Sequence, residues 1–279
     1  MATAAAHPVA TLREYATALE AALSVCLARP KPGAVHDLRS ATRRIEAQLQ
    51  LIDLMPNIPR HSSQKLKLFK HLAKLRRAAG IVRDLDIQQR MLAAAFPHSA
   101  EAAELRARLR EEREAGAATL VALLARRQIK TSAALQSLLS ALKPAERRSL
   151  AAKRLLQITE EWFTARSHAH ARKRETEDTL HSIRKAAKLA RYLAESAPGS
   201  SAKAAASRYE RMQKTGGHWH DWLQLSKLSG IGRKGALAEH MKRRVAAHLH
   251  TFRATLATHP THLEKDHAQP AQRRHQPRS

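Results

Sequence analysis

Two short histidine–arginine motifs contain the residue types and spacing that could do chemistry. The first, VHDLR at residues 35–39, is followed by Arg43, and the second, LHSIR at residues 180–184, is followed by Lys188. In both motifs a histidine precedes an arginine by three positions, so on a helix the imidazole and the guanidinium lie one turn apart. Guanidinium is a planar fork suited to phosphate oxygens, and lysine supplies a point charge. The histidines are interpreted either as further donors, strongest at acid pH, or as structural residues.

Basic stripes extend from these motifs along the helices that must position them. At about 100° per residue, His36, Arg39 and Arg43 fall within about 60° of one another, opposite Leu38 and Ile45. Similar stripes recur in three further segments. Their basic members are Lys67, Lys70, Lys74 and Arg77; His181, Arg184, Lys188 and Arg191; and Arg208, Arg211 and Lys214.

The stripes contain few acidic residues. On an ordinary exposed helix, glutamate at i±4 would relieve the repulsion between neighbouring cations. Glu46 and Glu195 are the near exceptions here. One stripe alone is compatible with a solvated helix face, but four in a repeated arrangement predict that a counter-charge arrives from outside the chain.

The overall charge supports the same hypothesis. The 279 residues contain 50 Lys and Arg against 24 Asp and Glu, a formal net charge of +26. Excess like charge repels itself and opposes compaction, so such an imbalance is typical of proteins with a polyanionic partner. Nucleic acid, polyphosphate and an anionic membrane surface are the candidate classes.

Composition and periodicity predict an all-α fold. The hydrophobic content is 43% and the aromatic content 4%, and the 9 glycines and 11 prolines are few for a β-fold. Apolar residues recur at helical periods between prolines and polar clusters. The expected helices are 9–28, 33–54, 62–79, 81–95, 99–127, 132–141, 145–169, 174–196, 201–215, 217–229 and 234–257. Pro144 is expected to open the helix at 145–169.

An internal repeat predicts how these helices are organised. Downstream of the two motifs, the series Lys74, Arg77, Gly80, Arg83 and Asp84 is matched without a gap by Arg211, Lys214, Gly217, His220 and Asp221. Two matched helices in the same order indicate duplication of a helical hairpin, and hence two similar bundles. The predicted domains are residues 9–142 and 143–258, followed by a disordered basic tail at 259–279.

The paired motifs resemble the CHAD family, named for conserved histidines in an α-helical domain. The residues that carry the resemblance are His36, Arg39, Arg43, Arg44, Gly80, Arg83, Asp84, Asp86, His181, Arg184, Lys188 and Tyr192. The resemblance covers about residues 9–257. It implies two four-helix bundles related by pseudo-two-fold symmetry, with a basic groove or pore between them.

The resemblance also implies binding of inorganic polyphosphate and, for stand-alone members, association with polyphosphate granules. The matched His, Arg and Lys residues would line the groove, and the stripes would add further walls. The second copy departs from the first at Lys188, which loses the bidentate geometry of arginine, and at His220, which stands where Arg83 stands. Many family members are fused to a triphosphate-hydrolysing domain with a Glu-x-Glu-x-Lys signature, which this sequence lacks, so hydrolysis is not implied.

Nucleic-acid backbone binding is the main alternative. Basic stripes would serve DNA or RNA equally well through counterion release. Stacking on bases requires exposed aromatic side chains, however, and the sequence has three Trp, three Tyr and four Phe. Trp219 and Trp222 are interpreted as core or groove wall, and no familiar nucleic-acid-binding motif is present.

Other classes of function have weaker support. The segment from His36 to Thr42 is similar to the phospho-accepting box of sensor histidine kinases, but the usual following proline is missing. Neither a glycine-rich phosphate loop nor a metal-ligand spacing of Cys and His is present, and Asp84 and Asp86 are expected to pair with Arg83 and its neighbours. We therefore expect a non-enzymatic protein without cofactor or metal. We also expect no membrane span and no membrane partner, because the apolar and basic faces are expected to serve inside the fold rather than as one exposed amphipathic helix. The expected location is the cytoplasm, on polyphosphate granules.

Overall fold

The computed structural model describes residues 5–171, 175–228 and 235–259. Within these ranges the fold is all-α, which confirms the predicted fold class. The helices are α1 (Pro8–Ala28), α2 (Pro32–Asp53), α3 (Ser62–Ala95), α4 (Ala100–Leu142), α5 (Ala152–Ala171), α6 (Glu177–Glu195), α7 (Ser200–Ser226) and α8 (Ala236–Ala257). Two short strands, β1 (Ala5–Ala6) and β2 (Leu150–Ala151), pair antiparallel and tie the start of the chain to the start of its second half.

Three helices are longer than the sequence predicts. The breaks expected at Gly80, between residues 127 and 132, and at Gly216 were wrong, because α3, α4 and α7 each continue through them. A glycine inside a helix costs about 1 kcal/mol relative to alanine, and packing of a long helix against its neighbours offsets that cost. Each half of the described chain therefore has four α-helices.

The second half starts later than predicted. Pro144 lies in a three-residue 3-10 helix, Lys143–Ala145, and α5 begins only at Ala152, because β2 is used to pair with β1. α6 begins behind a capping box in which the Thr176 and Thr179 side chains each accept a hydrogen bond from the backbone N–H of the other residue. These local hydrogen bonds fix where the helix that contains His181 starts.

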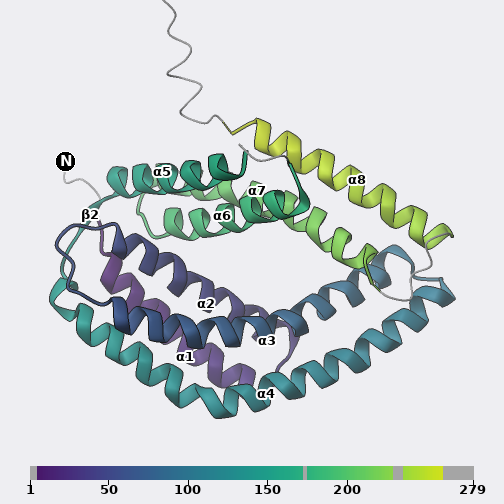
Figure 1. Cartoon of the computed structure of the whole chain (residues 1–279), viewed down its shortest axis with the longest axis horizontal. Helices are drawn as coiled ribbons and strands as arrows, with labels where there is room; N and C mark the ends of the chain where they lie inside the picture. The colour runs from purple at the N-terminus through teal and green to yellow at the C-terminus, as the bar shows by residue number, and fades with distance from the viewer. Residues whose placement is uncertain (1–4, 172–174, 229–234, 260–279) are drawn as a thin grey trace, which may run out of the picture.

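The first four helices share one apolar core. α3 packs along α4, α1 packs along α2, and α4 returns to contact α1, as Figure 1 shows. Leu12, Leu38, Leu75 and Leu135 contribute to this core from α1, α2, α3 and α4 in turn, and all four are fully buried. The basic motif of α2 is therefore backed by apolar side chains on the opposite face, as the periodicity predicts.

The second half shares its core with the first. α6 packs against both α5 and α7, and α8 packs against α7. Ala6, Ala47 and Leu51 of the first half are buried in the same cluster as residues of α5, α6 and α7. Trp219 and Trp222 are buried in other apolar clusters, which confirms their interpretation as core residues.

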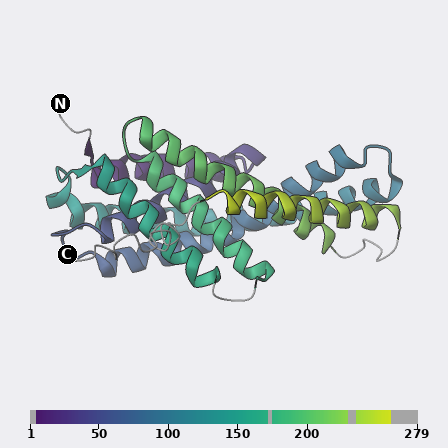
Figure 2. The same cartoon turned by 90° about the horizontal axis from the view of Figure 1, so that it is seen from above.

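Apolar contacts hold the two halves together at two separate places. One is the shared cluster where α2 meets α6. The other lies towards the tips of the α3–α4 and α7–α8 hairpins, where Leu92 and Leu109 pack with Trp222 and Met241. Both hairpins extend beyond the other helices in the same direction (Figure 2). The basic motifs lie between these two junctions.

The structure bears on the predicted tail at one residue. His259, which was assigned to the disordered tail, is buried against Phe163 and Tyr209, so that prediction was wrong for His259. Residues 260–279 lie outside the described residues. The domain boundaries at 142 and 258, and the symmetry relation between the halves, stay predictions.

Two adjacent glycines of α7 give a test of this packing. A Cβ atom at Gly216 would meet ring atoms of Phe252 at 2.8 and 2.9 Å, whereas a Cβ at Gly217 would meet nothing within 4 Å. We expect Gly216→Ala to lower the free energy of unfolding by about 1–3 kcal/mol, because a buried ring must move. Gly217→Ala should raise it by up to about 1 kcal/mol through helix propensity. Urea unfolding followed by circular dichroism measures both, and equal effects would contradict the packing.

Candidate anion-binding site

A charged cavity of about 550 Å³ lies between the α2–α3 pair and the α6–α7 pair. All four helices contribute to its walls, so residues far apart in the sequence meet there. Its lining is His36, Arg39, Ser40, Arg43, Arg83, Asp84, Ile87, His181, Arg184, Lys185, Lys188, Leu189, Gln213, Lys214, Gly217, His218, His220, Asp221 and Gln224. Seven of these side chains are Lys or Arg and two are carboxylates. The cavity is therefore strongly cationic.

Half of the predicted binding residues line this cavity. They are His36, Arg39, Arg43, Arg83, His181, Arg184, Lys188 and Lys214. The other half are not part of its lining: Arg44, Lys67, Lys70, Lys74, Arg77, Arg191, Arg208 and Arg211. Both histidine–arginine motifs thus converge on one place, while the α3 stripe from Lys67 to Arg77 is exposed on the flank of the first half.

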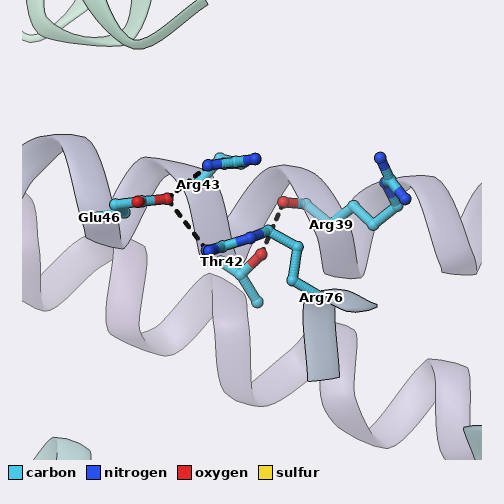
Figure 3. Close-up of polar contacts among 5 residues, drawn as sticks. All are labelled: Arg39, Thr42, Arg43, Glu46 and Arg76. Carbon is cyan, nitrogen blue, oxygen red and sulfur yellow. Dashed lines mark hydrogen bonds and ion pairs between the residues drawn. The ribbon is translucent and has the colours of Figure 1, made fainter. Parts of the chain in front are cut away.

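Several cations of the stripes pair with a carboxylate, among them the cations beside Glu46 and Glu195, the two near exceptions in the sequence. Glu46 accepts hydrogen bonds from Arg43 at 2.8 Å and from Arg76 at 3.0 Å, which joins α2 to α3 (Figure 3). The Glu46 side chain is 19% exposed, so this pairing is well shielded from water. Thr42, one residue before Arg43, donates its hydroxyl hydrogen to the Arg39 carbonyl at 2.8 Å. Arg43 is therefore held by Glu46 at the cavity wall.

Carboxylates neutralise three more predicted cations, Arg44 and Arg208 across helices and Arg191 within α6. Glu195 pairs with Arg44 at 3.2 Å and with Arg191 at 3.3 Å. Glu160 accepts from Arg208 at 2.8 Å. Helix periodicity finds Glu195 beside Arg191, four positions away on α6, but it misses the other two pairs, because Glu160 belongs to another helix than Arg208 and Glu195 to another helix than Arg44. We infer that these arginines stabilise helix packing.

The cavity also contains residues that the sequence analysis did not place in the site. The two carboxylates are Asp84 and Asp221, and Lys185 and His218 add further polar groups. Asp84 lies 4.0 Å from Arg39, so its charged neighbour is on α2 rather than the expected Arg83. The register of the internal repeat, which matches Asp84 with Asp221, was the signal that could have found this pair.

Asp86 has a structural role instead. Its carboxylate pairs with Arg113 of α4 at 3.0 Å, and its side chain is 6% exposed. Arg113 also donates to the Pro30 carbonyl at 2.5 Å. The expected ion pair of Asp86 is present, but the predicted partner was wrong, because Asp86 pairs with Arg113 of α4 and not with Arg83.

Two of the cavity histidines, His181 and His220, are held in their neutral form. His181 and His220 lie with ring centroids 4.3 Å apart. Burial and the nearby Arg184 lower the pKa of His181 to about 4 and that of His220 to about 3. The Arg184 guanidinium lies 3.3 Å from Nδ1 of His181, a geometry in which the neutral ring accepts a hydrogen bond. At neutral pH the two rings add donors or acceptors to the site but no charge.

Lys188 is the cation most affected by its surroundings. Burial, followed by repulsion from Arg39 and Arg43, lowers the pKa of Lys188 to about 7. No carboxylate lies within ion-pair distance of it in the described part of the chain. The pKa of Asp221 is raised, chiefly because burial disfavours its charge. The carboxylates of the cavity therefore compensate the positive charge around Lys188 only weakly. A bound anion would supply the missing negative charge and relieve the repulsion.

Comparison with known proteins defines the class. The CHAD domain family model matches residues 10–230. This chain belongs to the CHAD domain family. The crystal structure of the CHAD domain from the plant Ricinus communis is similar, with a TM-score of 0.64, 17% sequence identity, and coverage of 94% of this chain and 95% of that one. PptA from Streptomyces chartreusis gives a TM-score of 0.62 and 16% identity, over 92% of this chain and 100% of that one. A comparison with curated protein sequences gives no match.

The charge on Lys188 should cost stability when no anion is bound. We expect Lys188→Met to raise the free energy of unfolding by about 1–3 kcal/mol. The pKa of Lys188 is about 7 in the folded protein and 10.5 ordinarily. The loss of stability caused by its charge is therefore largest below pH 7 and decreases as the pH rises towards 10.5. Unfolding curves at pH 6 and pH 9 should show the larger gain at pH 6. Lys203→Met, at an exposed position of α7, is the control. An equal gain in stability there would contradict the claim that the buried charge of Lys188 destabilises the fold.

Proposed function

We propose that this protein binds inorganic polyphosphate in the cavity between its two halves. The observation that carries the proposal is the convergence of seven Lys and Arg side chains with two carboxylates from α2, α3, α6 and α7. Each phosphate unit of the polymer carries about one strong negative charge, and arginine and lysine suit its oxygens. Membership of the CHAD family supports the same ligand class.

The chemistry of the cavity favours a polymer without bases over nucleic acid. Its lining includes no Trp, Tyr or Phe among the described residues, and base stacking would need such side chains. All three tryptophans, Trp162, Trp219 and Trp222, are buried in apolar clusters. Backbone-only binding of DNA or RNA is the second candidate, which the net charge of +26 would favour.

We further propose a binding role without catalysis, at polyphosphate granules in the cytoplasm. In the described ranges, no group of three or more His, Cys, Asp and Glu side chains could hold a metal ion. None of the described helices has the length and apolarity needed to cross a bilayer. The proposed role of the cavity is to hold the polymer through charge, so affinity should rise with chain length and fall with salt.

Three matched triple variants test whether the cavity binds the polymer. Changing Arg83, Lys185 and Lys214 to Gln removes three charges that line the cavity. The other two triples remove as many exposed charges elsewhere: Lys67, Lys70 and Lys74 on α3, and Lys153, Lys203 and Arg243 outside all the predicted stripes. We expect the cavity triple to weaken long-chain polyphosphate binding by about tenfold or more, on the scale of one charge-assisted hydrogen bond of about 1.5–3 kcal/mol.

Fluorescence anisotropy at physiological ionic strength measures all three triples. The triple of Lys153, Lys203 and Arg243 is the control. An equal loss of affinity in this control would mean that diffuse charge attracts the polymer, and it would contradict the cavity as the binding site. A loss in the α3 triple would add the predicted stripe to the binding surface. Duplex DNA and RNA compete in the same assay, and a clear preference for either would replace polyphosphate as the ligand.

Binding should also take up protons. A polyanion beside Lys188, His181 and His220 would raise their pKa values from about 7, 4 and 3. Affinity should therefore increase as the pH falls from 8 to 6, because Lys188 becomes charged in this range. Calorimetry in buffers of different ionisation enthalpy gives the number of protons. Lys188→Met should lose the uptake near pH 7, and unchanged uptake would exclude Lys188 as its source.

A further inference from the structure

The two halves of the molecule differ most in their fourth helix. In chain order, α8 holds the place in the second half that α4 holds in the first, since each forms a hairpin with the helix before it. α4 has 43 residues and α8 has 22. At 1.5 Å per residue, α8 is about half as long as α4. The second half therefore lacks a counterpart to the C-terminal part of α4 in the described chain.

That missing part has a clear function in the first half. The C-terminal part of α4 lies against α1 and α3, and it buries Leu135, Leu138, Leu139 and Leu142 in the shared core. In the second half, α8 packs against α7 and has no comparable contact with α5. Figure 1 shows α4 running the length of the first half, whereas α8 ends where it reaches α5.

An open groove lies where the missing helix would be. It has a volume of about 1160 Å³ and is bounded by residues 156–165 of α5 and 201–211 of α7. Its walls include Leu156, Ala165, Ala204 and Ala205, which are small or apolar. The Thr164 hydroxyl lines the groove and is a buried polar atom without a hydrogen-bond partner in the described residues.

The groove is held in shape by a set of hydrogen bonds. Glu160 accepts from the Tyr209 hydroxyl at 2.7 Å and from Arg208 at 2.8 Å, which joins α5 to α7. His259, just after α8, lies 3.1 Å from the other Glu160 oxygen. These contacts lower the pKa of Glu160 to about 2 in spite of its burial, so the carboxylate stays charged at neutral pH. The groove is therefore formed before anything enters it.

We propose that an amphipathic helix of a partner protein docks in the groove between α5 and α7 and completes the second bundle. The walls extend for about ten residues, so the docked helix would have about three turns. Its apolar stripe would carry residues like those of α4, which places Leu135, Leu138, Leu139 and Leu142 against the first half. An acidic residue at the edge of the stripe would lie beside Arg211, which has no ion-pair partner among the described residues, in keeping with the net charge of +26. This proposal does not depend on polyphosphate as the ligand.

The chain itself offers a poor occupant. Residues 260–279 contain Pro260, Pro270 and Pro277 and only three apolar residues, so their sequence does not give an apolar helical stripe. A second copy would have to supply an exposed stripe as well. The exposed large hydrophobics of the described residues are Val25, Leu54, Leu66, Ile81 and Ile129, and none is three or four positions from another. A partner of different sequence therefore fits the groove better.

Site-specific crosslinking tests the proposal in the full chain. A photo-reactive benzoylphenylalanine replaces Ala204 in the groove, and, as the control, Ala118 on the exposed face of α4. After irradiation in the cells where the protein occurs, mass spectrometry identifies the peptide attached at each position. We expect the Ala204 peptide to come from another protein and to have apolar residues at i, i+3, i+4 and i+7 with an acidic residue at the edge of that stripe.

A synthetic peptide of that sequence is then titrated against the full chain. We expect one peptide to bind per chain and to become helical, and Ala204→Arg to weaken binding at least about tenfold, as at an interface hot spot. Ala118→Arg should bind the peptide normally, and both variants, which change exposed alanines, should keep the helical content and polyphosphate affinity of the unchanged protein. Crosslinks to residues 260–279, to a second copy or to nothing beyond the Ala118 control would overturn the proposal. So would peptide binding that is insensitive to Ala204→Arg.

Discussion

Repulsion between cations in the central cavity is the constraint on which the rest of the structure depends. If nothing opposed it, this repulsion would drive the α2–α3 pair and the α6–α7 pair apart. The cations concerned are Arg39, Arg43, Arg184 and Lys188. The opposing interaction is apolar, because clusters at the α2–α6 contact and towards the hairpin tips hold the halves together on both sides of the cavity. The fold therefore keeps an unfavourable charge arrangement in place, a pattern typical of functional sites.

Carboxylates decide which cations remain available to a ligand. Glu160 and Glu195 pair with Arg208, Arg44 and Arg191 and leave those arginines with a structural role, whereas Glu46 holds Arg43 at the cavity wall. Lys188, by contrast, has no ion-pair partner among the described residues and has a lowered pKa. Partial neutralisation of this kind removes several arginines from the set available to a ligand, although the α3 stripe from Lys67 to Arg77 stays exposed outside the cavity.

Much of the fold and about half of the site could be predicted from the sequence, for physical reasons that differ between residues. Helical periodicity identified the faces that contain His36 and Arg184, since those faces depend on local geometry. Gly80 and Gly216 suggested breaks, but the space a glycine leaves for Arg39 or Phe252 depends on a neighbouring helix. The Glu160–Arg208 pair and the position of Asp221 also depend on tertiary contacts, which a helix-by-helix analysis does not include.

The pairing of β1 with β2 has a consequence for how the chain assembles. The hairpins α3–α4 and α6–α7 join neighbours in the sequence and can form early, at low loop-closure cost. Ala5 and Ala6 cannot pair with Leu150 and Ala151 until the whole first half has been synthesised, and Ala6 is then buried beside α5 and α6 residues. The N-terminal strand therefore joins the structure only after the first half has formed, and the burial of Ala6 then couples the first half to the second.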